Sequence, residues 1–341
     1  MPTVDEVCVV TVTYGDRAHL LKRVVERCLE EGVKKVVIVD NASHGKSREI
    51  IPTLPKTYNN VVVISLRENT GSAGGYKRGL EYVYNDAECK YVWLLDDDNL
   101  PTRGALQALL RAYNEINHPH KEHKVALASA REQPLHVLRR EIKEGIPTRV
   151  LRKNAFLGFN IMYLLPRKIF SMLNMSLSAS CIKTMGAHIV RRPYAPYGGL
   201  FFHKSLIDTI GYPDERFYLY ADDTEWTYRI TCKGGAIYMV LSSIVLDIDD
   251  ENRQRRTLRG LPLSAARFYV FMPEWKLYYT VRNRVYLERT NFMDNSLLYF
   301  FNRRLLLLLF RLILCDKKYA IAKEVVRDGM GRVLGRKYVV C

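Results

Sequence analysis

Three consecutive carboxylates end an apolar run in VWLLDDDN, residues 92–99. Because side chains alternate along a strand, we expect Asp96 and Asp98 on one side and Asp97 on the other. A buried carboxylate without a partner is costly, and paired hard oxygen donors suit Mg²⁺ or Mn²⁺, which also take phosphate oxygens of a substrate. The alternative is a helix cap formed by Asp98 or Asn99.

A second acidic group lies in YADDTEW, where Asp222, Asp223 and Glu225 precede a helix-like segment. A carboxylate aimed into a pocket can act as a general base toward a hydroxyl group. The alternative is structural, since the helix dipole favours acidic residues in a first turn.

The third candidate is RENTGSAGGYKRG, residues 67–79, whose small residues let backbone N–H groups approach a ligand before a helix N-terminus. The segment is neither a dinucleotide-binding glycine motif nor a Walker A loop. A tight turn before a helix explains the segment equally well, so it supports a ligand site only together with the aspartates.

Four apolar runs must position these residues: VCVVTVT, KKVVIVD, VVVIS and YVWLLD. They are predicted to be strands buried on both faces, with helices at residues 17–32 and 74–85. This rhythm favours an α/β layer with a mostly parallel sheet, whose ligands bind beyond the carboxyl ends of the strands. Polar loops follow all four strands there and outline one site.

The second half is less regular. Residues 131–155 are predicted to be an exposed basic excursion, and FLGFNIMYLL (156–165) a strand. A helix is expected from about Lys204, another at DDTEW and a strand at AIYMVL. HPHKEH (118–123) is predicted to be a solvated loop, with a histidine metal site as the alternative.

The chain is expected to be helical beyond about residue 262. Arg304, Arg311 and Lys318 recur every seven residues, so they are expected on one face of an apolar helix. That helix is predicted either to lie in the core or to rest in an anionic membrane interface. The basic runs RREIKEG…RVLRK and NRQRRTLRG favour the second alternative.

The composition of the chain limits its expected partners and cellular compartment. The 341 residues carry a net charge of +16, which suggests anionic partners such as nucleotide diphosphates or acidic lipids. Nucleic acid is not expected, since the carboxylates would repel its phosphates. The seven scattered cysteines form no metal or disulfide framework, which favours a reducing cytoplasmic setting. Neither a signal peptide nor a transmembrane segment is expected.

The ordered motifs resemble family 2 glycosyltransferases of the GT-A fold over about residues 5–330. They are VVTVTYGDR, VVIVDNAS, LRENTGSAGGYKRGL, WLLDDDN, GGLFFHK, ADDTEW and YYTVRNRVYLERT. IAKEVVRDGMGRVLGRK resembles the tail of the bacterial galactofuranosyl- and rhamnosyltransferase branch. The resemblance implies a GT-A catalytic domain over 1–260, with a nucleotide-sugar half (1–130) and an acceptor half (155–260), and a helical, membrane-associating region over 261–341.

Site residues follow from the resemblance by position. The donor site is expected to comprise Thr13, Arg17, Asp40, Asn69, Gly74, Gly75, Asp96 and Asp97. Asp96 and Asp98 match the Mn²⁺ or Mg²⁺ motif, and Asp247, or alternatively Asp249, stands where relatives place a histidine ligand. Asp223 matches the catalytic base. The acceptor site is expected to comprise Asp222, Glu225, Trp226 and Gly199.

The implied reaction is single displacement with inversion, most readily transferring galactofuranose from UDP-galactofuranose. The acceptor is a hydroxyl of a polysaccharide or lipid-linked glycan in the cell envelope. Rhamnose transfer from dTDP-rhamnose is the alternative, and a sugar nucleotidyltransferase a more distant one. The protein is expected at the inner face of the membrane, and an oligomer is compatible with the sequence.

Overall fold

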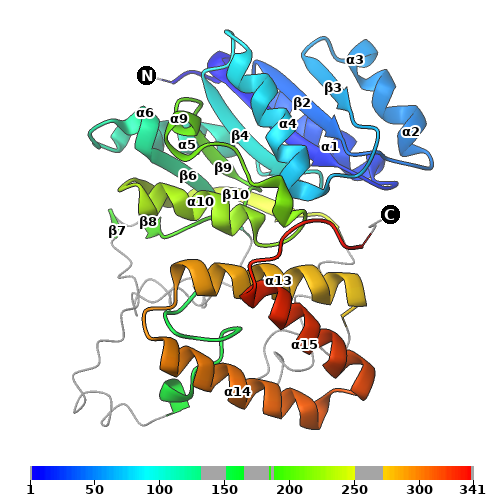
Figure 1. Ribbon diagram of the computed structural model, residues 1–341. Helices are drawn as coiled ribbons and strands as arrows, with labels where there is room; N and C mark the ends of the chain where they lie inside the picture. The colour runs from blue at the N-terminus through cyan, green and yellow to red at the C-terminus, as the bar shows by residue number, and fades with distance from the viewer. Residues whose placement is uncertain (1, 132–150, 165–183, 186–187, 250–271, 339–341) are drawn as a thin grey trace.

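The computed structural model describes residues 2–131, 151–164, 184–185, 188–249 and 272–338 (Figure 1). Its first half is a parallel sheet of β1 (Val7–Thr13), β2 (Lys35–Asp40), β3 (Val61–Ser65) and β4 (Tyr91–Asp96). All seven residues of β1 are buried. Valine and isoleucine stabilise such strands because branched side chains pack well on a pleated surface. The four strands predicted from the sequence are confirmed.

The second half extends the same sheet with strands that run both parallel and antiparallel to their neighbours. The strand order is β3-β2-β1-β4-β9-β6-β10-β8-β7, and β5 pairs with β10. The added strands are β5 (Asn99–Pro101), β6 (Val125–Arg131), β7 (Thr184–Met185), β8 (Ile189–Arg192), β9 (Leu200–His203) and β10 (Ala236–Asp247). Strand β9 is antiparallel to both β4 and β6 and joins the two halves. The expected α/β fold is confirmed.

Helices cover both faces of this sheet. On one face α1 (Ala18–Glu30) and α5 (Ala105–Glu115) pack their apolar residues into a shared core. On the other face lie α4 (Gly71–Asn85), α9 (Leu206–Ile210) and α10 (Asp222–Cys232). Short helices complete the layer: α2 (Ser47–Ile50), α3 (Leu54–Thr57), α6 (Lys121–Lys124) and the 3₁₀ turns η1 (Val4–Glu6), η2 (Ile51–Thr53), η3 (Ile161–Leu164) and η4 (Glu215–Phe217).

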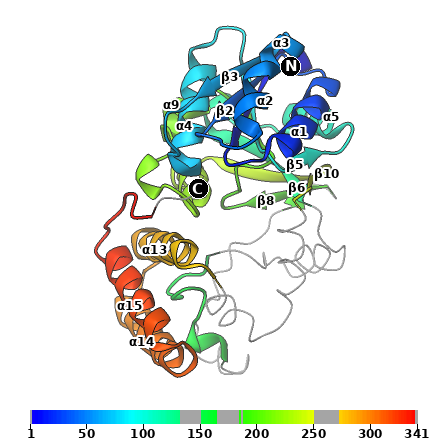
Figure 2. The ribbon, with the colours of Figure 1, turned by 90° about the vertical axis from the view of Figure 1, so that its right-hand side faces the viewer.

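Three long helices form a separate group below the sheet (Figures 1 and 2). They are α13 (Glu274–Asn291), α14 (Ser296–Ile313) and α15 (Asp316–Met330). The C-terminal region is therefore helical, as predicted. After α15 the chain returns toward the sheet, where Arg336 pairs with Glu68 at 2.7 Å. No helix within the described part of the chain is long and apolar enough to cross a bilayer.

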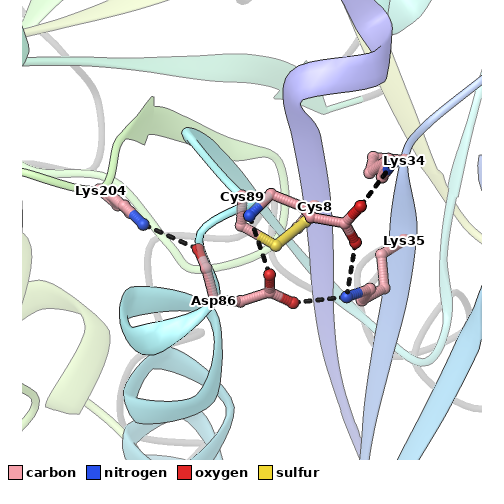
Figure 3. The surroundings of a disulfide bond; sticks show 7 residues. Cys8, Lys34, Lys35, Asp86, Cys89 and Lys204 are labelled. Carbon is pink, nitrogen blue, oxygen red and sulfur yellow. Dashed lines mark hydrogen bonds and ion pairs between the residues drawn. A yellow bond between two sulfur atoms is a disulfide. The ribbon is translucent and has the colours of Figure 1, made fainter.

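A disulfide corrects the expectation for the cysteines. Cys8 of β1 and Cys89, just before β4, are bonded across a sequence separation of 81 residues (Figure 3). Their separation hid the pair, because only the parallel contact of β1 with β4 brings them together. Of the other described cysteines, Cys28 is buried and free, whereas Cys232 and Cys315 are free and exposed. Cysteine usage therefore gives no support to a reducing compartment.

Several local predictions change. The strand expected at 156–165 is wrong where the structure describes it, because positive φ at Leu157 (49°) and Gly158 (83°) turns the chain before η3. Lys318 lies on α15, so it cannot continue the face of α14 that carries Arg304 and Arg311. Most of the 131–155 excursion and of the two basic runs lies outside the described residues.

Candidate active site

The carboxyl ends of β1, β2 and β4 meet at one edge of the sheet. Thr13 is in register with Asp40, and Val12 with Asp96. The first and third of these strands continue directly into the polar segments TYGDR and DDDN. Parallel strands therefore gather donor-site candidates that lie far apart in the sequence.

Strand alternation does not separate Asp97 from Asp98, because both lie in the turn after β4 and contact Arg17. Asp97 points into the protein. It is 3% exposed, and its carboxylate accepts hydrogen bonds from Thr13 Oγ1 (2.7 Å) and Arg17 Nη2 (2.9 Å). Burial raises the pKa of Asp97, against the opposing effect of Arg17. Burial disfavours the charge on Arg17, yet its bonds to Asp97 raise the pKa of Arg17 above the ordinary value. Thr13 and Arg17, expected to line the nucleotide, are thus bound to Asp97.

Asp96 and Asp98 have other partners. Asp96 accepts hydrogen bonds from the Tyr76 hydroxyl (2.8 Å) and Arg131 Nη2 (3.2 Å), and 39% of its side chain is exposed. Asp98 accepts from Arg17 Nη2 (3.0 Å). Burial, then the charges of Asp96 and Asp97, raise the pKa of Asp98 to about 7. One arginine does not offset this density of negative charge.

The helix-cap alternative for this triplet is wrong. The triplet runs from the end of β4 into β5, and the helix that follows begins at Ala105. Its N-cap is Gly104, with φ 77° and no side-chain capping bond. The acids at 96–98 therefore serve no helix.

The end of β10 brings two more carboxylates to the triplet. Asp247 is opposite Asn99 in the β5–β10 ladder, and the N–H of Ile248 donates to the Asp98 carbonyl at 2.9 Å. Asp249 accepts from Arg17 Nη1 at 2.9 Å. Both aspartates expected as a further metal ligand therefore lie beside the triplet.

The donor set suits a hard divalent cation. The two carboxylates of Asp96 and Asp98 lie at one strand end, and burial together with the neighbouring charges raises the pKa of Asp98, an effect that a cation would oppose. Within the described ranges, no three His, Cys, Asp or Glu side chains are arranged to hold an ion by themselves. Asp96 and Asp98 would therefore hold Mg²⁺ or Mn²⁺ together with phosphate oxygens and water, which these ions commonly retain.

An amide pair shapes the loops after β2 and β3. Asn41 Nδ2 donates to Asn69 Oδ1 at 3.0 Å and to the Gly71 carbonyl at 3.0 Å, while Asn41 Oδ1 accepts from Thr70 N at 2.8 Å. Asp40 accepts from Ser43 N at 2.9 Å. Asn69 of the expected donor site is thus held by Asn41, a residue that the sequence did not single out.

Gly74 and Gly75 lie inside the first turns of α4, which begins at Gly71 rather than at Gly74. A Cβ on Gly75 would lie 2.5 Å from Val12 Cγ1, and one on Gly74 would lie 2.5 Å from Thr70 Oγ1. Both glycines therefore let α4 pack closely on β1 and its own preceding loop. The helix predicted over residues 74–85 is therefore confirmed, but it begins three residues earlier than predicted.

A second carboxylate cluster starts α10. Asp222 is 4% exposed and accepts from Ser72 Oγ at 2.7 Å. Asp223 accepts from the N–H of Thr224 at 2.6 Å and its hydroxyl at 3.2 Å. Burial and then the charge of Asp223 raise the pKa of Asp222 to about 8, and burial also raises the pKa of Asp223.

The two clusters share one electrostatic environment. The charge of Asp96 raises the pKa of both Asp222 and Asp223, and Arg131 lowers the pKa of Asp223. Arg131 also hydrogen-bonds Asp96 and, through Nη2 at 2.9 Å, Asn99. The end of β6 thus places an unpredicted arginine between the two clusters.

Two residues predicted for the acceptor site make contacts with other parts of the protein. Trp226 is fully buried, donates from Nε1 to the Gly211 carbonyl at 2.8 Å and packs against Tyr197. Its expected place in the acceptor site is therefore wrong, because α10 directs this side chain into the core between the helix and the sheet. Glu225 is held by Arg229 at 2.6 Å.

Gly199 joins two strands, donating to the Leu94 carbonyl at 2.7 Å and accepting from Ser129 N at 2.9 Å. Its neighbour Gly198 is the one that approaches the carboxylates, since a Cβ there would lie 2.7 Å from Asp96 Oδ2. The glycine pair was recognisable in the sequence, but which member faces the site depends on the strand pairing.

Comparisons with known proteins show what the chain is similar to. Residues 8–148 match the family described as Glycosyl transferase family 2. The galactofuranosyltransferase GlfT1 of Mycolicibacterium smegmatis is 23% identical over 293 residues, covering 84% of each chain.

Two solved structures are similar in fold. GalNAc-T7 with UDP, GalNAc and Mn²⁺ has a TM-score of 0.52 at 14% identity, and the match covers 96% of this chain and 58% of that one. TarS 1–349 of S. aureus in complex with UDP-GlcNAc has a TM-score of 0.51 at 14% identity, with 96% and 81% covered. The chain carries a glycosyl transferase family 2 domain on a GT-A fold and is a glycosyltransferase.

Proposed function

We propose that this glycosyltransferase moves a sugar, with inversion, from a nucleoside diphosphate to an acceptor hydroxyl in a metal-dependent reaction. One observation carries the proposal: Asp96 of the donor cluster lies close enough to Asp222 and Asp223 to raise the pKa of both. A cation-binding group and a proton acceptor are thus neighbours, as a direct displacement requires.

Asp223 is the better base of the acidic pair. Two adjacent buried carboxylates cannot both ionise cheaply, so the pair loses its second proton late. Two donors of Thr224 stabilise the ionised form of Asp223, whereas Ser72 donates one hydrogen bond to Asp222. Asp223 then takes the proton of the acceptor hydroxyl, while Asp222 keeps its own proton near neutral pH.

Basic side chains stand where the leaving group would separate. Arg131 at the end of β6 contacts Asp96, and Arg17 holds Asp97 and Asp98 in place. A bound Mn²⁺ or Mg²⁺ would offset the charge that develops on the departing nucleoside diphosphate. Arg131 would support the same charge from the side of the acceptor cluster.

The proposed donor is UDP-galactofuranose, and the proposed acceptor is a polysaccharide or lipid-linked glycan hydroxyl. The similarity to a galactofuranosyltransferase over 84% of both chains supports this choice. dTDP-rhamnose remains the second candidate. We retain residues 1–260 as the catalytic domain, with donor half 1–130 and acceptor half 155–260, and residues 261–341 as an accessory helical region.

A donor screen tests the proposal. The purified chain is incubated with UDP-galactofuranose or dTDP-rhamnose, with and without Mn²⁺, and released nucleotide and product mass are measured. We expect UDP release and a mass increase of one hexose on the acceptor, both dependent on metal. Release of pyrophosphate would instead indicate a nucleotidyltransferase, and metal-independent transfer would remove the cation from the proposal.

We also propose that α14 rests on an anionic membrane surface at the inner face of the cell membrane. Leu297, Phe301, Leu308 and Leu312 share one helix face and are 82%, 56%, 58% and 77% exposed. Arg304 and Arg311 are exposed along the same face, so an apolar stripe lies beside basic groups. A lipid-linked acceptor would then be met at the bilayer surface.

Vesicle flotation at low ionic strength tests this face. Phe301→Glu combined with Leu308→Glu should weaken binding to phosphatidylglycerol-containing vesicles at least about tenfold, since each buried apolar side chain contributes roughly 1.5–3 kcal/mol. Ile50→Glu is the matched control, because Ile50 is exposed on α2, away from α14 (Figure 1). Equal flotation of both variants, or none by the unmodified chain, would contradict the proposal.

A further inference from the structure

The loop that leads into the acidic pair has an unusual backbone. Between η4 and α10, three residues with side chains have positive φ: Tyr218 (63°), Tyr220 (67°) and Ala221 (61°). Ala221 is the N-cap of α10, so Asp222 and Asp223 follow at once. Left-handed backbone is unfavourable for such residues, and several together persist only where the surroundings hold them.

Two buried side chains of α13 hold this loop. Nδ2 of Asn283 lies 3.0, 2.9 and 2.8 Å from the carbonyl oxygens of Phe217, Leu219 and Tyr220. Nη2 of Arg282 donates to the Phe217 carbonyl at 3.0 Å, and its Nε donates to Asn283 Oδ1 at 2.8 Å. Asn283 is 0% and Arg282 1% exposed, so water does not compete for these carbonyls.

The opposite side of the loop rests on the start of α4. The N–H of Ala73 donates to the Tyr218 carbonyl at 3.3 Å, and a Cβ on Gly71 would lie 1.9 Å from that oxygen. Ser72 donates to Asp222 at 2.7 Å. The loop is therefore enclosed between α13 and the element that follows the donor loop, and it can shift only if one of them does.

We propose that Asn283 and Arg282 are positioning residues that keep the 217–221 loop in its left-handed form and thereby aim Asp223 at the acceptor. This inference rests on the proposed function, because it assigns the two residues a task only if Asp223 acts as the base. It gives a role to the RN pair of YYTVRNRVYLERT, a motif on a helix outside the sheet. Neither residue touches the reacting groups.

The chemistry of the pair fits the task. An amide group offers two N–H donors without a charge, and the guanidinium of Arg282 adds donors in a fixed plane. Arg282 also donates through Nη1 to the Gly335 carbonyl, while Gly335 N donates to the Arg216 carbonyl at 2.8 Å. The same two residues therefore join α13, the returning C-terminal segment and the loop of the base.

The test compares two buried asparagines. Asn283→Ala removes three carbonyl contacts of the loop, whereas Asn302→Ala removes a contact to the Asn154 carbonyl at 2.9 Å from an equally buried amide on α14. We expect Asn283→Ala to lower kcat on the order of a hundredfold, as misplaced catalytic groups do. The KM for the donor and its equilibrium affinity should stay within about twofold. Asn302→Ala should lower thermal stability to a similar extent and leave kcat nearly unchanged.

A second variant strains the same loop without touching α13. Ala221→Val places a β-branched side chain at φ 61°, where it is strongly disfavoured, and should reduce kcat without weakening donor binding. Unchanged kcat in folded Asn283→Ala and Ala221→Val would overturn the positioning role, as would equal kcat losses in Asn283→Ala and Asn302→Ala. Full activity of Asp223→Asn would overturn the proposed function instead, so the two failures are distinguishable.

Discussion

The two carboxylate clusters differ in what surrounds them. In the donor cluster, Asp97 and Asp98 contact Arg17, and Asp96 contacts Arg131. In the acceptor cluster, Asp222 contacts the hydroxyl of Ser72 and Asp223 contacts Thr224. Burial raises carboxylate pKa values in both clusters, but only in the donor cluster do guanidinium groups oppose that rise by direct contact. One cluster is therefore suited to cations and phosphates, and the other to moving a proton.

Replacing the base should give the largest effect. Asp223→Asn keeps the shape of the side chain but removes its basicity, so kcat should fall on the order of a thousandfold. Donor affinity, measured by calorimetric titration with the donor nucleotide and Mn²⁺, should be nearly unchanged. A normal kcat in this variant would show that Asp223 is not the base and that the acceptor cluster does not carry out the proton transfer.

Replacing a donor-cluster carboxylate should show the opposite pattern. Asp98→Asn should weaken Mn²⁺-dependent nucleotide binding about tenfold to a hundredfold, because one charged oxygen ligand is lost. Chelation of the metal should weaken nucleotide binding by the unmodified chain in the same assay. If Asp98→Asn leaves the metal dependence of binding unchanged, the assignment of the cation to this cluster is wrong.

The acidic pair should also affect stability in a pH-dependent way. Since the pKa of Asp222 is raised to about 8 by burial and Asp223, the folded state holds a proton that the unfolded chain releases near pH 4. Stability is therefore highest below about pH 4 for this group and falls as pH rises toward 8. Asp222→Asn should remove that decline and stabilise the fold at pH 8 by roughly 1–3 kcal/mol.

Urea unfolding at pH 5 and pH 8 measures this difference. The gain should appear at pH 8 and be small at pH 5, where Asp222 already carries its proton in the folded state. A gain of equal size at both pH values would point to improved packing rather than to relief of a buried charge.

The smallest effect is expected at Glu225. Its carboxylate pairs with Arg229 four positions along the same helix, and such pairs contribute about 0.3–0.5 kcal/mol. Glu225→Gln should therefore change both kcat and stability only slightly. A loss of acceptor affinity without a change in donor affinity would show that Glu225 belongs to the acceptor site.

Consecutive acids after apolar runs were recognisable in the sequence, although a helix cap and the helix dipole were competing explanations. The sequence did not reveal Arg131, Tyr76, Ser72 or Asn41, because a single polar residue carries no such signal until its partner is known. Trp226 was assigned to the wrong environment for the same reason. Its position after the acids suggested the site, whereas the orientation of α10 places it in the core.

The sequence by itself determined the four parallel strands of the first half, the order of their loops and the positions of both acidic clusters, because these depend on local periodicity and composition. The tertiary structure decided which groups meet. Arg17 reaches Asp97 across 80 residues and Asp249 across 232, and the disulfide joins residues 81 apart. Asn283 lies over 60 residues beyond the loop it holds. Such contacts result from strand order and helix packing, and no local pattern encodes them.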